Sequence, residues 1–329
     1  MKLSIIIPTL GRPTLQRVLK GIEECQFFGT ISPEILVISD KAIEDDTLQT
    51  RFPKVKFLTT GNKLGSSPAR NVGIEAATGD ILAFIGDDTI PTSSWLVRIV
   101  EFHRLFPDSH LALLGKTSWS PRLEKDPFHR WLEDHAQFRF EQIRREGAKW
   151  RNFYTSNISV KREMIGSSRF FERFTGWGFE DIEFGYRLIK KGLRLHYDEL
   201  CEVLHDHPQT LEGMCKNYRN ARKNAKIFES LHSEVSILPR GRRRLTLKTL
   251  VWLAGFFPKR QFPQIFWLRE WKKAWLGENE KEEKEETEKN QISDFRSHSS
   301  SHSSLNVQQH PSAKEQDQTK LNDELGGVQ

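Results

Sequence analysis

The chain has 329 residues, a formal net charge of +6 and 37% hydrophobic residues, a content low enough to indicate that part of it does not fold. The charge is unevenly spread: residues 1–213 are neutral, residues 214–277 carry a net +12, and residues 278–329 a net −6. We therefore predict a folded domain over 1–213, a basic, aromatic-rich helical extension over 214–277 and a disordered polar and acidic tail over 278–329.

The cysteines and the apolar runs exclude further classes. Three cysteines without metal-ligand spacing argue against a disulfide scaffold or a zinc knuckle and favour a reducing, cytoplasmic compartment. No stretch of about 18 apolar residues occurs, so we expect no membrane span. The N-terminal apolar run ends at Pro8 and is better interpreted as a first strand than as a signal peptide.

The first part of the chain alternates strand-like and helix-like segments. Short apolar runs predict strands over 3–7, 34–38, 54–58 and 81–85. Apolar residues at helical spacing predict helices over 15–22 and 68–77. Strands separated by helices are typical of an α/β protein with a mostly parallel central sheet and a nucleotide-sized crevice at its carboxyl edge.

Two adjacent acids follow the most apolar of these strands. The run over 81–85 suits a strand buried on both faces, and it stops at Gly86, Asp87 and Asp88. Neighbouring carboxylates repel each other unless a cation compensates them, and a divalent metal would do so. The alternative is a turn in which these residues only cap the next element.

The pattern is looser beyond residue 90. We expect a helix over 93–106, strands over 111–114, 154–160 and 193–197, and either helices or a mobile cover over 121–150. A helix then begins at Glu180 and Asp181, after a Gly-Trp-Gly segment over 176–178. The helix dipole would keep Asp181 ionised as a base near neutral pH, although acids at helix starts also serve as ordinary caps.

Five segments, taken together and in order, resemble family 2 glycosyltransferases of the Rossmann-like GT-A fold. They are SIIIPT (4–9), VISD (37–40), the run from Gly65 through ARNVGI (69–74), AFIGDD (83–88) and WGFED (177–181). The resemblance covers about residues 1–210. The Trp-Gly-x-Glu-Asp segment is also similar to the acceptor motif of galactosyltransferase-type enzymes.

The resemblance implies roles on the donor side. Thr9 and Asp40 would hold the nucleoside, and Arg70 would face the diphosphate of a UDP- or GDP-type sugar donor. Asp88 would bind Mn²⁺ or Mg²⁺, with Asp87 beside it towards the ribose or the sugar. The sequence departs from the family pattern at Gly86, which stands where the family has the first acid of its metal motif.

The metal site has a further candidate ligand. His205 matches a histidine that completes the metal site in related enzymes, and imidazole suits Mn²⁺ better than Mg²⁺. His207 is the alternative ligand, and a surface loop that merely contains two histidines is the alternative interpretation.

The resemblance also implies roles on the acceptor side. Asp181 would take the proton from the acceptor hydroxyl, with Glu180 orienting that hydroxyl or the donor sugar. One base and in-line attack imply inversion at the anomeric carbon. Trp177 would form a sugar-stacking wall or would simply pack, and Asn157 would lie near the acceptor pocket or be a polar residue at a strand edge.

The basic segment over 214–277 interleaves cations with aromatics. Trp267, Trp271 and Trp275 are four residues apart and share a helix face. This pattern predicts peripheral association with an anionic membrane, on its inner face, and a glycan or lipid-linked acceptor in polysaccharide or glycolipid synthesis. Aromatics packing onto the catalytic domain are the alternative, and nucleic acid is a third and less favoured partner.

Two other functions stay open at this point. A nucleotidyltransferase could use a similar crevice, but it would show a Gly-rich basic loop near the first strand, and here only Gly11 and Arg12 approach one. A noncatalytic basic binding protein would explain residues 214–277 but would leave Asp40, Asp88 and Asp181 without a purpose.

Overall fold

The computed structural model describes residues 1–278 except residues 27, 42–45, 62 and 125. Residues 1–278 form one compact unit, so the basic segment is part of the same body as the sheet. The tail predicted to be disordered lies, apart from Glu278, outside the described residues. Within the described part of the chain no helix is both long enough and apolar enough to cross a bilayer.

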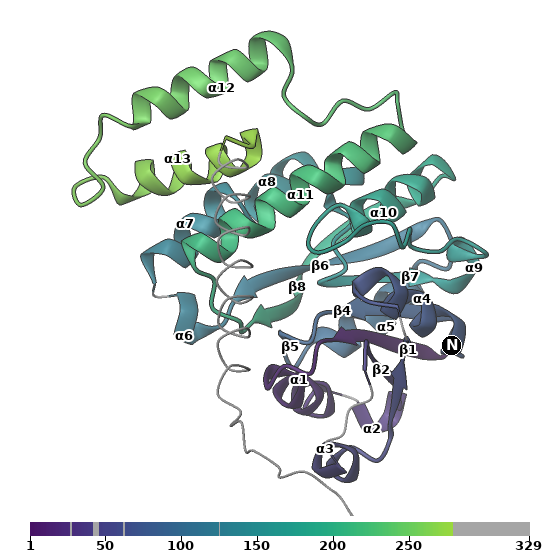
Figure 1. Ribbon diagram of the computed structural model, residues 1–329. Coiled ribbons are helices and arrows are strands. Elements are labelled where there is room, and N and C mark those ends of the chain that lie inside the picture. Colours follow the sequence, from purple (N-terminus) through teal and green to yellow (C-terminus); the bar gives the residue numbers. More distant parts are fainter. Residues whose placement is uncertain (27, 42–45, 62, 125, 279–329) are drawn as a thin grey trace, which may run out of the picture. The chain divides into compact units, whose positions relative to one another are not determined.

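A single mixed sheet organises this unit (Figure 1). Its strands are β1 (Leu3–Thr9), β2 (Glu34–Ser39), β3 (Val55–Thr59), β4 (Ile81–Ile85), β5 (Thr89–Pro91), β6 (Leu111–Trp119), β7 (Asn157–Lys161) and β8 (Arg194–His205). The spatial order is β3-β2-β1-β4-β7-β6-β8-β5. Strands β1 to β4 run parallel, and β7 is antiparallel to both of its neighbours.

Helices cover both faces of the sheet. They are α1 (Thr14–Glu23), α2 (Phe28–Ile31), α3 (Asp46–Arg51), α4 (Ser66–Ala76), α5 (Trp95–Leu105), α6 (Pro121–Glu124), α7 (Pro127–His135), α8 (Phe140–Glu146), α9 (Arg162–Ile165), α10 (Glu180–Lys190), α11 (Leu211–Leu231), α12 (Gly241–Ala254) and α13 (Pro263–Leu276), with one 3-10 turn, η1 (Trp150–Asn152). The prediction of an α/β fold with a mostly parallel sheet is confirmed.

Alternate residues of the central strands build two cores. In β1, Ile5 and Ile7 face the core under α1 and α5, while Ile6 faces the opposite core with α4 and α10. Strand β4 alternates in the same way, with Ala83 in the first core and Phe84 in the second. Fully burying one such isoleucine stabilises the fold by about 2 kcal/mol. The apolar run over 81–85 is thus buried on both faces, as expected from its composition.

Helix α4 lies unusually close to the sheet. A Cβ atom on Gly73 would lie 2.5 Å from Cγ2 of Ile6, so only glycine allows this approach. The close packing fixes the start of α4, with Ser66 and Arg70, beside the carboxyl ends of β1 and β2.

Several elements differ from the sequence prediction in extent. Strand β6 continues to Trp119 and β8 continues to His205, because the two strands pair in parallel beyond the predicted ends, with a bulge between Gly115 and Lys116. The charged residues of β8 hid this continuation in the sequence. The segment over 121–150 forms the short helices α6, α7 and α8, and the strand expected to begin at residue 154 begins at Asn157.

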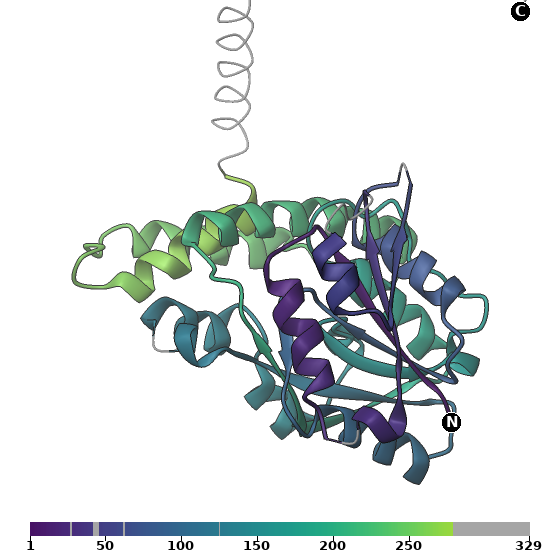
Figure 2. The ribbon, with the colours of Figure 1, turned by 90° about the horizontal axis from the view of Figure 1, so that it is seen from below.

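The C-terminal helices gather against one another. Helix α13 packs along α11, and α12 packs on α13 (Figures 1 and 2). Trp267 and Trp271 of α13 contact a core that includes Phe128 and Trp131 of α7. The tryptophan face of α13, which was expected to meet a membrane, is therefore packed against α7 and α11, where the rings are half-buried.

Candidate active site

A cavity of about 720 Å³ opens at the carboxyl ends of β1, β2 and β4. Its other walls come from the turn before α10, the end of β8, and helices α11 and α13. Every predicted site residue except Asn157 lines it: Thr9, Asp40, Arg70, Asp87, Asp88, Trp177, Glu180, Asp181 and His205. His207, the alternative metal ligand, is not among the lining residues.

The acids after β4 are compensated by Arg12. Asp87 accepts hydrogen bonds from Thr9 Oγ1 at 2.7 Å and from Arg12 Nη1 at 2.7 Å. The same guanidinium nitrogen lies 3.0 Å from Asp88 Oδ2, so one cation bridges both carboxylates. Sequence reasoning did not assign Arg12 to the site. Two adjacent acids need a compensating cation, and this was the sequence signal that could have identified Arg12. Arg12 lies in the loop after β1.

The structure explains why a glycine occupies position 86. A Cβ atom at this position would lie 2.8 Å from Asp88 Oδ1, so any side chain here would displace that carboxylate. Glycine at position 86, where the family pattern has an acid, thus leaves the Asp88 carboxylate the space in which it contacts Arg12.

His205 is brought to Asp88 by the sheet. Thr89 of β5 pairs with His205 at the end of β8, which sets His205 Nε2 3.6 Å from Asp88 Oδ2. The Trp119 ring meets the imidazole edge-on at 4.9 Å. Burial lowers the pKa of His205 and outweighs the opposing effect of Asp88, so the ring is neutral at neutral pH and keeps a lone pair for a metal.

The side chains near Asp88 fit a metal ion whose coordination is completed by the phosphates of a bound substrate. The described residues contain no cluster of three or more His, Cys, Asp or Glu able to hold an ion by themselves. Mg²⁺ and similar ions at phosphate sites are commonly held by one or two protein groups together with the phosphates of the substrate. Asp88 with His205 matches that arrangement in number of protein ligands, and the imidazole favours Mn²⁺ over Mg²⁺.

Asp40 organises the loop that leads into α4. Both of its carboxylate oxygens lie 3.0 Å from the amide nitrogen of Gly65, which has a φ of +106°. The acid is half-buried at the end of β2 and lines the cavity about one strand away from Thr9. It is positioned at the edge of the cavity where the parallel strands end.

Arg70 and Glu180 form a buried ion pair across the cavity. Arg70 Nη1 lies 3.2 Å from Glu180 Oε1, which also accepts a hydrogen bond from Ser66 Oγ. Arg70 Nε and Glu180 Oε2 are buried and have no hydrogen-bond partner among the described residues. Buried polar atoms are normally satisfied, so these two atoms indicate a polar ligand in the cavity.

Asp181 sits at the start of α10 after a strained turn. Phe179 adopts a left-handed conformation with φ +73°, between Gly178 and the helix, and so directs the acids into the cavity. Asp181 accepts hydrogen bonds from the amides of Ile182 at 2.8 Å and Thr155 at 3.3 Å.

The electrostatic surroundings of Asp181 differ from the expectation. Burial, and then repulsion by Glu180, raise its pKa to about 7, against the lowering effects of Arg70 and of the amides of Thr155 and Ile182. The helix start alone predicted that the amide dipoles favour the ionised form, and in the structure desolvation outweighs them and raises the pKa. A pKa near neutrality suits a group that accepts a proton in a reaction.

Trp177 and Asn157 were both expected on the acceptor side. Trp177 lines the cavity, is 38% exposed and lies 5.6 Å from the ring of Tyr218. Asn157 is buried in β7: its Oδ1 accepts from Trp95 Nε1 at 2.8 Å, and its amide nitrogen donates to the carbonyls of Lys116 and Cys201. Asn157 is therefore a structural residue, and its expected place at an acceptor pocket is corrected.

Two further cations line the cavity, Arg151 of η1 and Lys272 of α13. Arg151 and Lys272 form no ion pair with a carboxylate of the described residues, and both lie against tryptophan rings. Burial, with repulsion from Arg139 and Arg243, lowers the pKa of Lys272 to about 8. The two cations form an electropositive surface without an internal counter-charge.

Comparison with known proteins shows which proteins this chain resembles. The family model described as Glycosyl transferase family 2 matches residues 4–167. The hyaluronan synthase of Pasteurella multocida is 26% identical over 262 residues, which are 68% of this chain and 26% of that protein. The glucosyl-dolichyl phosphate glucuronosyltransferase of Haloferax volcanii is 26% identical over 239 residues, 70% of each chain.

The fold is also found in a solved structure. A mannosyltransferase from Pyrobaculum calidifontis, determined in complex with GDP-Man and Mn²⁺, has a TM-score of 0.53 and 14% identity. The likeness covers 84% of this chain and 87% of the mannosyltransferase. The chain thus shares a whole fold with this protein, whereas it spans about a quarter of the hyaluronan synthase.

Proposed function

The chain belongs to glycosyltransferase family 2, and from this premise we propose that it transfers a sugar from a nucleoside-diphosphate sugar to an acceptor hydroxyl, with inversion at the anomeric carbon. The observation that carries the proposal is the convergence of Asp40, Asp88 and Asp181 on one cavity. These acids come from three distant parts of the chain, and their meeting supports a common ligand. The unpartnered atoms of Arg70 and Glu180 support a polar one.

The donor half of the site is assigned to the carboxyl edge of the sheet. Asp40 and Thr9 would bind the nucleoside, Asp87 would lie towards the ribose or the sugar, and Arg70 would offset the charge of the leaving diphosphate. Asp88 and His205 would hold Mn²⁺ or Mg²⁺. The metal, when bound, supplies a Lewis acid that stabilises negative charge on the diphosphate.

The acceptor half is assigned to the start of α10. Asp181, with its pKa near 7, would take the proton of the attacking hydroxyl, and Glu180 Oε2 would orient that hydroxyl or the donor sugar. Trp177 would stack against an acceptor ring. The acceptor oxygen would form its bond to the anomeric carbon on the face opposite the diphosphate, while the bond from that carbon to the diphosphate oxygen breaks. This single in-line displacement accounts for inversion.

The decisive experiment is a screen of nucleoside-diphosphate sugars with and without Mn²⁺. We expect metal-dependent release of nucleoside diphosphate from one donor by the wild-type protein, and its loss in Asp181→Asn when an acceptor hydroxyl is the nucleophile. Near-normal transfer by Asp181→Asn would refute the role of Asp181. Failure to bind any such donor would refute the proposed function as a whole.

We also propose that the protein works at an anionic membrane surface, on a glycan or lipid-linked acceptor. The supporting surface consists of exposed aromatic residues in α12 and in the turn that follows it, namely Trp252, Phe256 and Phe257. Arg242, Arg243, Lys259 and Arg260 lie in the same stretch of chain and are exposed. Basic residues next to exposed aromatics are typical of helices that lie in a membrane interface.

A further inference from the structure

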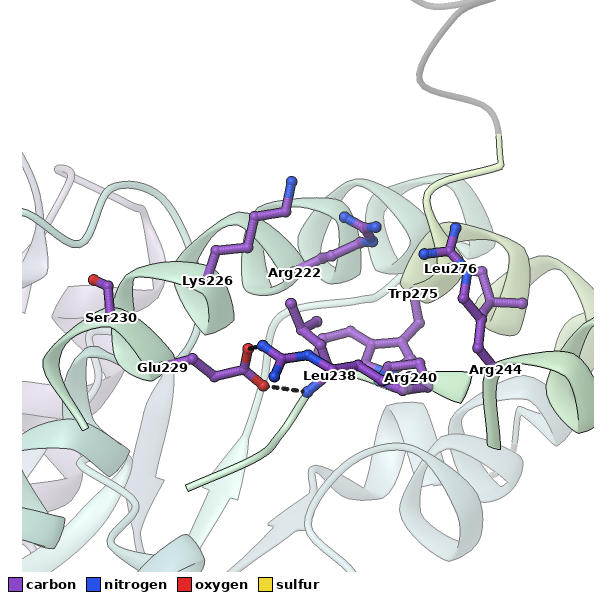
Figure 3. A pocket seen from close by; sticks show the side chains of 10 residues that line it. Arg222, Lys226, Glu229, Ser230, Leu238, Arg240, Arg244, Trp275 and Leu276 are labelled. Carbon is purple, nitrogen blue, oxygen red and sulfur yellow. Dashed lines mark hydrogen bonds and ion pairs between the residues drawn. The ribbon is translucent and has the colours of Figure 1, made fainter. Parts of the chain in front are cut away.

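A second cavity lies between the last three long helices. It has a volume of about 500 Å³ and is lined by α11, the segment 238–240, the first turn of α12 and the end of α13 (Figure 3). Four of its lining residues are cations, namely Arg222, Lys226, Arg240 and Arg244. The cavity lies outside the set of residues assigned to the donor, the metal and the base.

The single carboxylate of this cavity is already engaged. Glu229 accepts a hydrogen bond from the amide of Ile237 at 2.7 Å. It also accepts one from the amide of Leu238 at 2.8 Å, and its other oxygen lies 2.6 Å from Arg240 Nη2 (Figure 3). Lys226 and Arg244 form no ion pair with a carboxylate of the described residues. The cavity therefore keeps a positive excess that its own acid does not neutralise.

The first turn of α12 reinforces this charge. Arg240 and Arg244 both belong to the start of that helix, which has no acidic residue in its first turn and no side-chain cap. The positive end of the helix dipole and the free amides favour an anion at this position. The helix dipole and the charges of Arg240 and Arg244 thus both favour binding of an anion.

Trp275 forms a wall that is common to this cavity and the catalytic one. Its side chain lines both cavities, and its ring lies 6.3 Å from the ring of Phe179, two residues before Asp181. The shared wall thus lies near the start of α10, which carries Asp181. Arg151 and Lys272 continue the positive surface on the catalytic side of Trp275.

We propose that this cavity is an acceptor subsite for an anionic group, a carboxylate or a phosphate carried by the acceptor at a distance from the reacting hydroxyl. This inference rests on the proposed function and narrows its substrate class to acidic acceptors. The acceptor passes over Trp275, its hydroxyl end reaches Asp181, and its anionic group binds Lys226 and Arg244. A uronic acid residue and a lipid-linked diphosphate are the two sources of such a group.

Binding of defined probes tests the subsite and separates the two sources. One probe is a tetrasaccharide of alternating glucuronate and N-acetylglucosamine, compared with the same tetrasaccharide after reduction of its carboxyl groups. The other is N-acetylglucosamine linked to a short-chain polyprenyl diphosphate, compared with the corresponding neutral glycoside. Calorimetry at low ionic strength measures the Kd of each pair.

We expect the wild-type protein to bind at least one charged probe more tightly than its neutral partner. The double substitution Lys226→Ala/Arg244→Ala should weaken charged-probe binding about tenfold or more, since each residue supplies a charge-assisted contact. Lys216→Ala/Lys223→Ala is the matched control, because both are exposed cations of α11 that line neither cavity. Thermal unfolding verifies that all variants fold.

Two results would overturn the inference: equal affinity for charged and neutral probes in the wild-type protein, or unchanged affinity in the double variant. Absence of binding by both charged probes also counts against it. Donor turnover by the wild-type protein is measured separately. Its absence refutes the glycosyltransferase activity, while the probe data still decide whether the cavity binds anions.

Discussion

Asp181 shows how the surroundings of one side chain set its chemistry. Its pKa of about 7 means that it is half ionised near neutrality and becomes a competent base as the pH rises. We expect the transfer rate to increase about tenfold between about pH 6 and pH 8 in the wild-type protein, in line with the ionised fraction. Asp181→Asn should lower kcat by about 10²-fold or more and abolish this rise. A pH profile of steady-state transfer measures both effects.

The same shift predicts a pH dependence of stability. Because the folded pKa lies above the ordinary value of 3.8, the half-buried carboxyl of Asp181 contributes stability below about pH 4 and loses that contribution as the pH rises through about 7. Asp181→Asn carries no ionisable group there. Its free energy of unfolding, measured with urea, should therefore increase relative to that of the wild type as the pH rises from about 4 to about 8. A difference that stays constant over this range would contradict the assigned shift.

Arg12 contacts the carboxylate oxygens that a metal at Asp88 would need. It holds Asp87 and Asp88 together, so Arg12→Ala should leave two repelling acids and lower the Tm of the metal-free protein by a few degrees, roughly 1 kcal/mol or more. Mn²⁺ should raise the Tm of Arg12→Ala more than that of the wild type, because no guanidinium has to be displaced. Differential scanning fluorimetry with and without chelator measures this. An equal metal response in the two proteins would argue against a metal at Asp88.

Strand β7 is held in place by the hydrogen bonds of one buried side chain. Asn157 ties it to α5, β6 and β8 through three hydrogen bonds. Asn157→Ala should cost about 2–4 kcal/mol of unfolding free energy, since it leaves the Trp95 indole and two carbonyls unsatisfied. The acceptor KM of the folded variant should stay close to that of the wild type.

Trp177→Ala provides the contrasting variant for that experiment. Trp177 is partly exposed at the cavity, so its removal should raise the acceptor KM with little change in unfolding free energy. Urea unfolding together with acceptor titration separates the two roles. An Asn157→Ala protein of wild-type stability with a raised KM would restore the acceptor role first expected for Asn157.

At the scale of the whole molecule, the basic segment divides into two parts. The tryptophans of α13 pack against α7 and α11, while Trp252 and Phe256 of α12 remain exposed at 64% and 68%. We expect Trp252→Ser/Phe256→Ser to reduce binding to anionic liposomes in sedimentation assays by about tenfold. Leu105→Ser removes an equally exposed apolar side chain from α5 and should leave binding unchanged. Equal binding by all three proteins would exclude α12 as the contact.

Much of the architecture could be predicted from the chain itself. The run over 81–85, the strand ends at Thr9 and Asp40 and the Gly-Trp-Gly lead to α10 indicated the sheet and most of the cavity lining, because strand period and turn residues are local signals. Longer strands and Asn157 were misjudged for the opposite reason. The pairing of β6 with β8 and the packing of Trp95 depend on contacts far apart in sequence.

The sequence by itself determined the α/β class, the family and the identity of the acids at the strand and helix ends, since these follow from residue type and short-range order. Only the tertiary structure decided which cation compensates Asp87 and Asp88, in which direction the pKa of Asp181 moves, and that Trp275 separates two cavities. Each of these depends on distance and burial. Both arise when segments far apart in the chain are brought into contact, and neither is encoded in any one segment.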